Sequence, residues 1–219
     1  MATLRPGFGP GLPELLAPRL RWSVQRTRRV LLALLALAVL VQGARILLSG
    51  GSGLTNDVLV REPVAFTLGY RDGLVRVTPG PGETLRLQSR PGGSTVERFV
   101  VSPLRIGPYE GDSAGILPVV AAREVSKLRA AFPTDFRYRG DARARINETP
   151  GHQISFQTRL GGRLHYGKRF LLLGEEGGEG VTLTLLSRYS AATPSVASVG
   201  VFGLMKGPLR SFRFGTERP

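Results

Sequence analysis

The sequence predicts an α+β protein, in which a single N-terminal transmembrane helix is followed by one antiparallel sheet packed with two helices. Three observations lead to this prediction. Residues 30–48 form a long apolar stretch without an acidic residue. From residue 63 onward, short segments of alternating apolar and polar side chains are separated by Gly- and Pro-rich turns. Stretches 115–132 and 193–206 carry helical signals. We therefore divide the chain into a basic tail (1–29), a transmembrane helix (30–48), a linker (49–62) and a folded domain (63–219).

The apolar stretch has the length and composition of a membrane-crossing helix. Residues 30–41 are only Leu, Ala and Val, and the whole stretch approaches the ~20 residues that a helix needs to cross a bilayer. Its polar members are Gln42 and Arg45. Arg45 lies near the far end, where its long side chain can reach the lipid headgroups.

The charges before the stretch predict its orientation. The tail contains one acid, Glu14, and six arginines: Arg5, Arg19, Arg21, Arg26, Arg28 and Arg29. Basic residues near the end of a span stay on the cytoplasmic side, so we expect a single-pass protein of the cell membrane with residues 50–219 outside. A cleaved signal peptide is an alternative, although its basic region would be long and the cleavage pattern at 41–43 is imperfect. The remaining alternative is a buried helix of a soluble protein.

Length and composition limit what the outer part can be. About 165 residues remain after the tail and span, enough for one domain with its own core. The chain contains no cysteine, which excludes disulfides, thiolate catalysis and cysteine-based metal sites. Its net charge is +14, which suits anionic headgroups, acidic polymers or nucleic acid as partners. A codon bias towards arginine is the alternative explanation of this charge.

The first part of the domain is divided by turns into short strands. Asp72-Gly73, residues 79–82 and residues 91–93 are turn signals. The strands that we expect between them are 64–68, 74–77, 85–87 and 98–106. Pro103 predicts an edge position or a bulge for the last of these. The sequence leaves open whether residues 55–110 belong to the same sheet as the rest.

The second part begins with an amphipathic helix over 115–132, which Pro133 ends. Its apolar face consists of Leu117, Val120, Ala121, Val125, Leu128 and Phe132. Strands are expected at 136–146, 153–160, 163–173 and 181–186, with a hairpin turn at Gly161-Gly162. Thr193-Pro194 is a helix start signal, so we expect a second helix to about Lys206. A final strand is expected at Leu209–Phe214.

These elements resemble a known fold over residues 116–215. The features are the helix 115–132, the paired strands around Gly161-Gly162, the segment Gly180–Thr184 and the terminal segment Leu209–Phe214. Together they resemble the PsbP-like fold of small extracytoplasmic proteins. The resemblance implies a binding or scaffold domain without catalytic activity, and it transfers no functional residue.

One short motif has the form of a catalytic site. Gly111-Asp112-Ser113-Ala114-Gly115 matches the G-x-S-x-G nucleophile elbow. No buried strand precedes it, however, and no parallel βαβ units accompany it. The other interpretation is that Asp112 or Ser113 caps the following helix. A membrane-anchored serine hydrolase using Ser113 is therefore only the alternative function.

The histidines do not indicate a metal site. His152 and His165 are the only two, and they lack metal-ligand spacing. We expect each in a loop or on a strand surface, and we expect neither a metal nor another cofactor.

The arginines of the middle strands are the candidate binding residues. Arg137 and Arg139 share one face of a strand, Arg143 and Arg145 share a face just after, and Arg159 and Arg163 flank the hairpin turn. If the sheet brings these six residues together, they form a patch for phosphate or carboxylate groups. The alternative is a solvated sheet face with scattered ion pairs. No nucleic-acid signature accompanies these arginines.

The function predicted from the sequence is a single-pass membrane protein that displays a non-catalytic binding or scaffold domain in the cell envelope. Its expected partners are the membrane through 30–48 and an envelope protein or anionic polymer, with no role for nucleic acid. An accessory subunit of a membrane complex is a further alternative.

Overall fold

The computed structural model describes residues 29–30, 32–34, 54–90, 96–107, 113–174 and 178–216. The chain has two units, Met1–Ser52 and Gly53–Pro219. In the first unit, residues 29–30 and 32–34 are helical, and the rest of the predicted tail and span lies outside the described residues. No helix among the described residues is both long and apolar enough to cross a membrane.

Two antiparallel sheets replace the single sheet that the sequence predicted. The smaller sheet has the order β1-β2-β10. Its strands are β1 (Asn56–Val60), β2 (Phe66–Tyr70) and β10 (Arg213–Phe214). The range predicted as a linker, 49–62, thus contains a strand. β2 pairs with β1 on one side and with β10 on the other, so the first and last strands of the unit share one partner.

The larger sheet has seven strands in the order β3-β4-β5-β9-β8-β7-β6. These are β3 (Val75–Val77), β4 (Leu85–Ser89), β5 (Glu97–Arg105), β6 (Arg137–Ile146), β7 (Thr149–Leu160), β8 (Arg163–Leu173) and β9 (Glu179–Arg188). Residues 55–110 are therefore split between the sheets, with β3 to β5 joining the larger one. The predicted hairpin is confirmed: Gly161 and Gly162 both have positive φ, as the tight turn between β7 and β8 requires.

Pro103 lies in an interior strand, but not where both sides of that strand are paired. β5 is hydrogen-bonded to β9 along its whole length, and Pro103 is opposite Val181. On the other side, β4 begins at Leu85, which is opposite Val101. Pro103 thus lies beyond the end of β4, where a residue without an N–H group interrupts no ladder.

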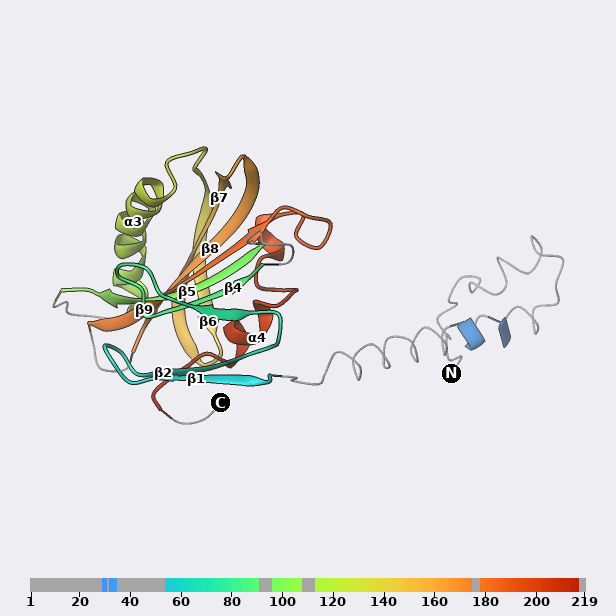
Figure 1. Cartoon of the computed structure of the whole chain (residues 1–219), viewed down its shortest axis with the longest axis horizontal. Coiled ribbons are helices and arrows are strands. Elements are labelled where there is room, and N and C mark those ends of the chain that lie inside the picture. The colour runs from blue at the N-terminus through green and yellow to red at the C-terminus, as the bar shows by residue number, and fades with distance from the viewer. Residues whose placement is uncertain are drawn as a thin grey trace, which may run out of the picture. The chain divides into compact units, whose positions relative to one another are not determined.

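Helix α3 (Ser113–Ala131) covers one face of the larger sheet, called the helix face below (Figure 1). α3 confirms the prediction of a helix over 115–132, and it ends just before Pro133. Leu117, Val120 and Leu128 are buried in one cluster with Ile154 and Phe156 of β7. The alternating residues of β7 that include Ile154 and Phe156 therefore point toward α3.

The opposite face of the larger sheet is covered by the small sheet and the C-terminal segment (Figure 1). Phe99 of β5 and Leu183 of β9 are buried there in one cluster with Phe66 and Phe212. The rings of Phe66 and Phe212 are 5.7 Å apart between centroids, so they join the two ends of the unit inside the core.

The predictions for the C-terminal segment were wrong. In place of a helix over 193–206, the chain has a three-residue 3-10 helix, η2 (Val196–Ser198), followed by turns. Gly200 and Gly203 both have positive φ, which breaks a helix. A helix, α4 (Lys206–Ser211), occupies most of the predicted final strand, and only Arg213 and Phe214 are extended.

Candidate anion-binding edge

Strand β6 forms one edge of the larger sheet and carries four of the six predicted arginines. It pairs with β7 on one side only. Most of its residues are exposed, including Arg137, Arg139, Arg143 and Arg145. An edge strand also presents unpaired backbone N–H and C=O groups. β6 therefore combines exposed guanidinium groups with a backbone edge that no other strand of the described residues pairs.

A β-bulge distributes these arginines over both faces of the sheet. The pairing with β7 shifts between Tyr138 and Gly140, so that Arg139 is the extra residue. Gly140 has φ +115°, a conformation that favours glycine. The bulge reverses the alternation of side chains along the rest of the strand.

As predicted, Arg137 and Arg139 share one face of the sheet, and Arg143 and Arg145 share one face. These two faces, however, are opposite. Arg143 is opposite His152 in the register and Arg145 is opposite Pro150, which places them on the helix face. On the other face, Arg137 is opposite Gln157, and Arg139 donates from Nε to Gln157 Oε1 at 2.8 Å. The arginines therefore flank one exposed edge from both sides.

The other two predicted arginines lie at the β7–β8 turn and not in the same group. Arg159 forms an ion pair with Asp135, Nε to Oδ2 at 2.9 Å, between half-exposed side chains. Such a surface pair contributes little to stability. Arg163 is opposite Leu160 in the register. Within the described residues, Arg137, Arg143 and Arg145 form no ion pair, so these three charges are available to a partner.

A polar network that the sequence did not reveal fixes β6 just after the bulge. The Asp141 carboxylate contacts His152 Nε2 and accepts a hydrogen bond from the Tyr138 hydroxyl. The hydrogen bond from Tyr138, with help from His152, lowers the pKa of Asp141. The same bond raises the pKa of Tyr138 to about 12. The only acid on β6 is therefore already engaged by two neighbours.

The surface position predicted for both histidines was wrong, since each is 5% exposed. His152 belongs to the β7 residues that point toward α3. His165 Nδ1 lies 2.9 Å from the carbonyl oxygen of Arg163. Strand alternation alone could not say that both faces of this sheet are covered.

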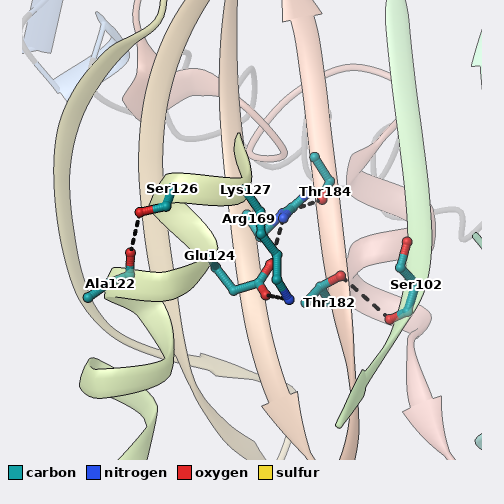
Figure 2. Close-up of polar contacts among 8 residues, drawn as sticks. All are labelled: Ser102, Ala122, Glu124, Ser126, Lys127, Arg169, Thr182 and Thr184. Carbon is teal, nitrogen blue, oxygen red and sulfur yellow. Dashed lines mark hydrogen bonds and ion pairs between the residues drawn. The ribbon is translucent and has the colours of Figure 1, made fainter. Parts of the chain in front are cut away.

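A buried ion pair joins α3 to the sheet (Figure 2). Glu124 Oε2 lies 2.7 Å from Arg169 Nη1, and Lys127 Nζ lies 2.6 Å from Glu124 Oε1. Arg169 Nε also donates to Thr184 Oγ1 at 2.9 Å. Burial lowers the pKa of Arg169, and Glu124 opposes this effect.

This pair sets the position of α3 and leaves little for a ligand, because both side chains are saturated by neighbours and mostly buried. One signal in the sequence could have revealed it. Glu124 stands in the apolar stripe of the helix, four residues before Leu128. An acid at that position requires a buried partner.

Ser113, the alternative nucleophile, is the first residue of α3. Its side chain and residues 111–112 lie outside the described residues. The two histidines that could serve as its base are held elsewhere, His152 by Asp141 and His165 by the Arg163 carbonyl. Among the described residues, no three His, Asp or Glu side chains gather as metal ligands would.

Comparison with known proteins identifies the fold but shows no activity. No family model matches the chain, and no curated protein matches it. Among solved structures, it is similar to cyanobacterial PsbP (CyanoP) from Synechocystis sp. PCC 6803. The identity is 13%, the TM-score is 0.53, and the match covers 73% of this chain and 92% of CyanoP.

Two further structures are less similar. LpqN, described as involved in cell envelope biogenesis of Mycobacterium tuberculosis, is 13% identical, with coverage of 75% of this chain and 91% of LpqN and a TM-score of 0.47. The Ran-binding protein Mog1p of Saccharomyces cerevisiae is 11% identical, with coverage of 72% and 94% and the same TM-score. TM-scores below 0.5 do not establish a shared fold.

The likeness to CyanoP confirms the PsbP-like fold expected from the sequence. The match covers 73% of the chain, which is more than the predicted range 116–215, a little under half of the chain. At this identity it shows the fold alone.

Proposed function

We propose that this protein is a single-pass membrane protein that displays a non-catalytic binding domain outside the cell membrane. In this proposal the β6 edge is the docking surface, and its partner is an anionic polymer of the cell envelope. The observation that carries the proposal is the exposure of four arginines on both sides of one unpaired strand edge.

The charge balance of the edge favours an extended anion. Arg137, Arg139, Arg143 and Arg145 are opposed on β6 only by Asp141, which Tyr138 and His152 already engage. Guanidinium groups bind carboxylate and phosphate oxygens through paired N–H donors. A strand rises about 3.3 Å per residue, so the two pairs of arginines are spread along the strand, one pair on each face of the sheet. A chain with repeated negative charges can contact all four, whereas one small anion cannot.

The placement in the membrane rests on the sequence. The arginine-rich tail and the apolar stretch 30–48 support a retained anchor with the tail inside. No catalytic role is proposed, and the PsbP-like fold is compatible with a binding or scaffold domain. A protein partner in the envelope is the other outcome that the binding experiment below would reveal.

The direct test measures binding of the detergent-solubilised full chain to long-chain polyphosphate and to poly-L-glutamate, by isothermal titration calorimetry at two salt concentrations. The R137S/R139S/R143S/R145S variant is expected to bind at least tenfold more weakly, because each exposed contact contributes on the order of 0.5 kcal/mol. The matched control is R76S/R105S/R123S/R210S, which removes four exposed arginines from β3, β5, α3 and α4.

The control variant has the same net charge as the β6 variant, so its binding separates a docking surface from general attraction. We expect it to bind almost as the native protein does. Equal weakening in the two variants would show that the polymer responds to net charge alone, and the β6 proposal would be wrong.

The membrane anchor is tested by cell fractionation. The full chain should remain in the membrane pellet after alkaline carbonate extraction, and residues 54–219 should be digested by protease added outside the cytoplasmic membrane. Release into the carbonate supernatant, or protection of these residues from the protease, would contradict the proposed topology.

A further inference from the structure

A second group of cationic side chains lies on the helix face, away from the β6 edge. Gln88 of β4 is directly opposite Arg98 of β5, and His165 of β8 is directly opposite Arg188 of β9. Arg98 is opposite Leu186, two residues before Arg188, and directly opposed residues share a face. Since α3 packs chiefly on β7, these residues lie beyond its main contact, although Gln88 and His165 are themselves buried. They form a row across four neighbouring strands.

The row adjoins a pocket of about 450 Å³ lined by Arg163, Leu164, Arg188 and Tyr189. Tyr189 is 56% exposed, and its ring packs edge-on against Tyr166 with 6.2 Å between centroids. The pocket is therefore lined by the guanidinium donors of Arg163 and Arg188 and by an aromatic side chain, Tyr189, whose ring lies on the Tyr166 side of the sheet. An organic anion requires both kinds of group.

The positive charges in this region are not neutralised by the described part of the chain. Arg98, Arg163 and Arg188 form no ion pair there, and Arg98 Nε is buried without a hydrogen-bond partner. The nearby acid is Glu83, which is bound to Arg86 at 2.6 Å. A buried donor without an acceptor is costly, and an oxygen of a bound anion would offset this cost.

The pKa of His165 is consistent with the pocket geometry, because Arg98, Arg163 and Arg188 all lie near its ring. Burial lowers the pKa of His165, and repulsion by Arg188, Arg98 and Arg163 lowers it further. Burial also lowers the pKa of Arg98, with repulsion from Arg86 and Arg90 adding to the effect. An anion bound between them would relieve this repulsion.

We propose that Arg98, Arg163, Arg188 and Tyr189, called the arginine pocket, bind an organic phosphate. The phosphate group would lie between the guanidinium groups of Arg163 and Arg188, with Arg98 behind it. The apolar or aromatic part of the molecule would lie against Tyr189 and Leu164. Arginine suits this role because its planar donor fork matches phosphate oxygens.

The arginine pocket is a different site from the β6 edge, and neither proposal depends on the other. Arg163 belongs to the six arginines singled out from the sequence, but its neighbours Arg98 and Arg188 come from strands that are distant in the chain. A compact pocket selects a small ligand, whereas the β6 edge presents its charges along the strand.

The experiment titrates the full chain in detergent with phenyl phosphate, and separately with inorganic phosphate and with phenol, by isothermal titration calorimetry. Phenyl phosphate is expected to bind at least tenfold more tightly than either fragment. R163Q and R188Q should each weaken it at least tenfold, because hydrogen bonds between charged groups are strong. Y189A should weaken phenyl phosphate while leaving inorganic phosphate unchanged.

The R123S/R210S variant is the matched control for R163Q/R188Q, because it also removes two arginines, both exposed, from α3 and α4. Its affinity for phenyl phosphate should equal that of the native protein. Circular dichroism and the Tm without ligand verify that each variant folds. No heat of binding at millimolar phenyl phosphate, or equal affinity in R163Q/R188Q and native protein, would overturn the proposal. So would equal loss in the R123S/R210S variant, because binding would then follow net charge. Inorganic phosphate that binds as tightly as phenyl phosphate would overturn the organic part of the assignment.

Discussion

Replacement of Gly167 by alanine tests the packing between α3 and the sheet most directly. Gly167 of β8 is directly opposite Phe156 of β7. A Cβ added to Gly167 would lie 2.2 Å from Cζ of Phe156 and 2.5 and 2.6 Å from its Cε atoms. Carbon atoms that are not bonded approach to about 3.5 Å, so the ring would have to withdraw by about 1.3 Å.

The Phe156 ring has no free space into which it can withdraw. It is fully buried and is stacked between Phe132 at 5.6 Å and Phe136 at 5.8 Å. Overpacking typically costs about 1–3 kcal/mol, and the rigid neighbours place this case at the upper end. Alanine recovers roughly 0.5–1 kcal/mol through lower chain entropy. We therefore expect Gly167→Ala to lower the free energy of unfolding by about 2 kcal/mol.

Urea unfolding of the full chain, followed by far-ultraviolet circular dichroism, measures this change. The control is Gly115→Ala in α3, where no heavy atom lies within 4 Å of the added Cβ. Alanine is the better helix former, so this variant should gain up to about 1 kcal/mol.

A double-mutant cycle with Phe156→Leu identifies the cause of the loss. The smaller side chain removes the clash, so most of the cost of Gly167→Ala should disappear in this background, with a coupling energy of at least about 1 kcal/mol. A cost that is the same in both backgrounds would refute the explanation. A Gly167→Ala variant as stable as the native protein would refute it as well.

Two further predictions concern buried charges. Arg169→Met leaves Glu124 buried with Lys127 as its remaining partner, so it should lower the free energy of unfolding by about 3–5 kcal/mol. The double variant Arg169→Met/Glu124→Leu should recover most of this loss in urea unfolding. A double variant as unstable as Arg169→Met would contradict the pairing. Burial raises the pKa of Glu97, although the Leu204 N–H opposes the shift. The folded state then holds the Glu97 proton more tightly than the unfolded state, so this stability is present in acid and is lost as the pH rises from 4.5 through the folded pKa. The Tm of Glu97→Gln relative to native protein should therefore be higher at pH 7 than at pH 4, and an equal difference at both would contradict the assignment.

The middle of the fold was predictable because its local signals are strong. The strands from residue 136 to 186 alternate clearly, and Gly161-Gly162 supplies the two positive φ angles of a tight turn. Helix α3 has a clear apolar stripe and a proline after its end. Local propensity and packing agree in these elements.

The predictions failed where the local sequence does not determine the structure of the segment. The C-terminal segment has a helix start signal at Thr193-Pro194, but Gly200 and Gly203 adopt positive φ angles that end any helix. The bulge at Arg139 has only one local signal, Gly140 within the strand pattern. A regular strand would place Arg137 and Arg143 on one face. A bulge reverses every assignment made across it.

The arginine pocket could not be found from sequence spacing, because its residues come from β5, β8 and the end of β9. Arg98 and Arg188 become neighbours only through the pairing of β5 with β9. That pairing joins segments on either side of α3, and no local pattern encodes it. Arg163 was identified only because it lies beside a visible turn.

The pairing of β5 with β9 also has a kinetic consequence. β3 to β5 and β6 to β9 are each built from neighbours in sequence, whereas Arg105 pairs with Glu179 across α3 and three strands. Closing so long a loop is slow, so we expect the two groups of strands to form first and to join last. Until they join, β5 and β9 are open edges lined by valine, leucine and phenylalanine, which other chains can add to. The centre of the finished sheet is therefore the part of the chain most exposed to aggregation during folding.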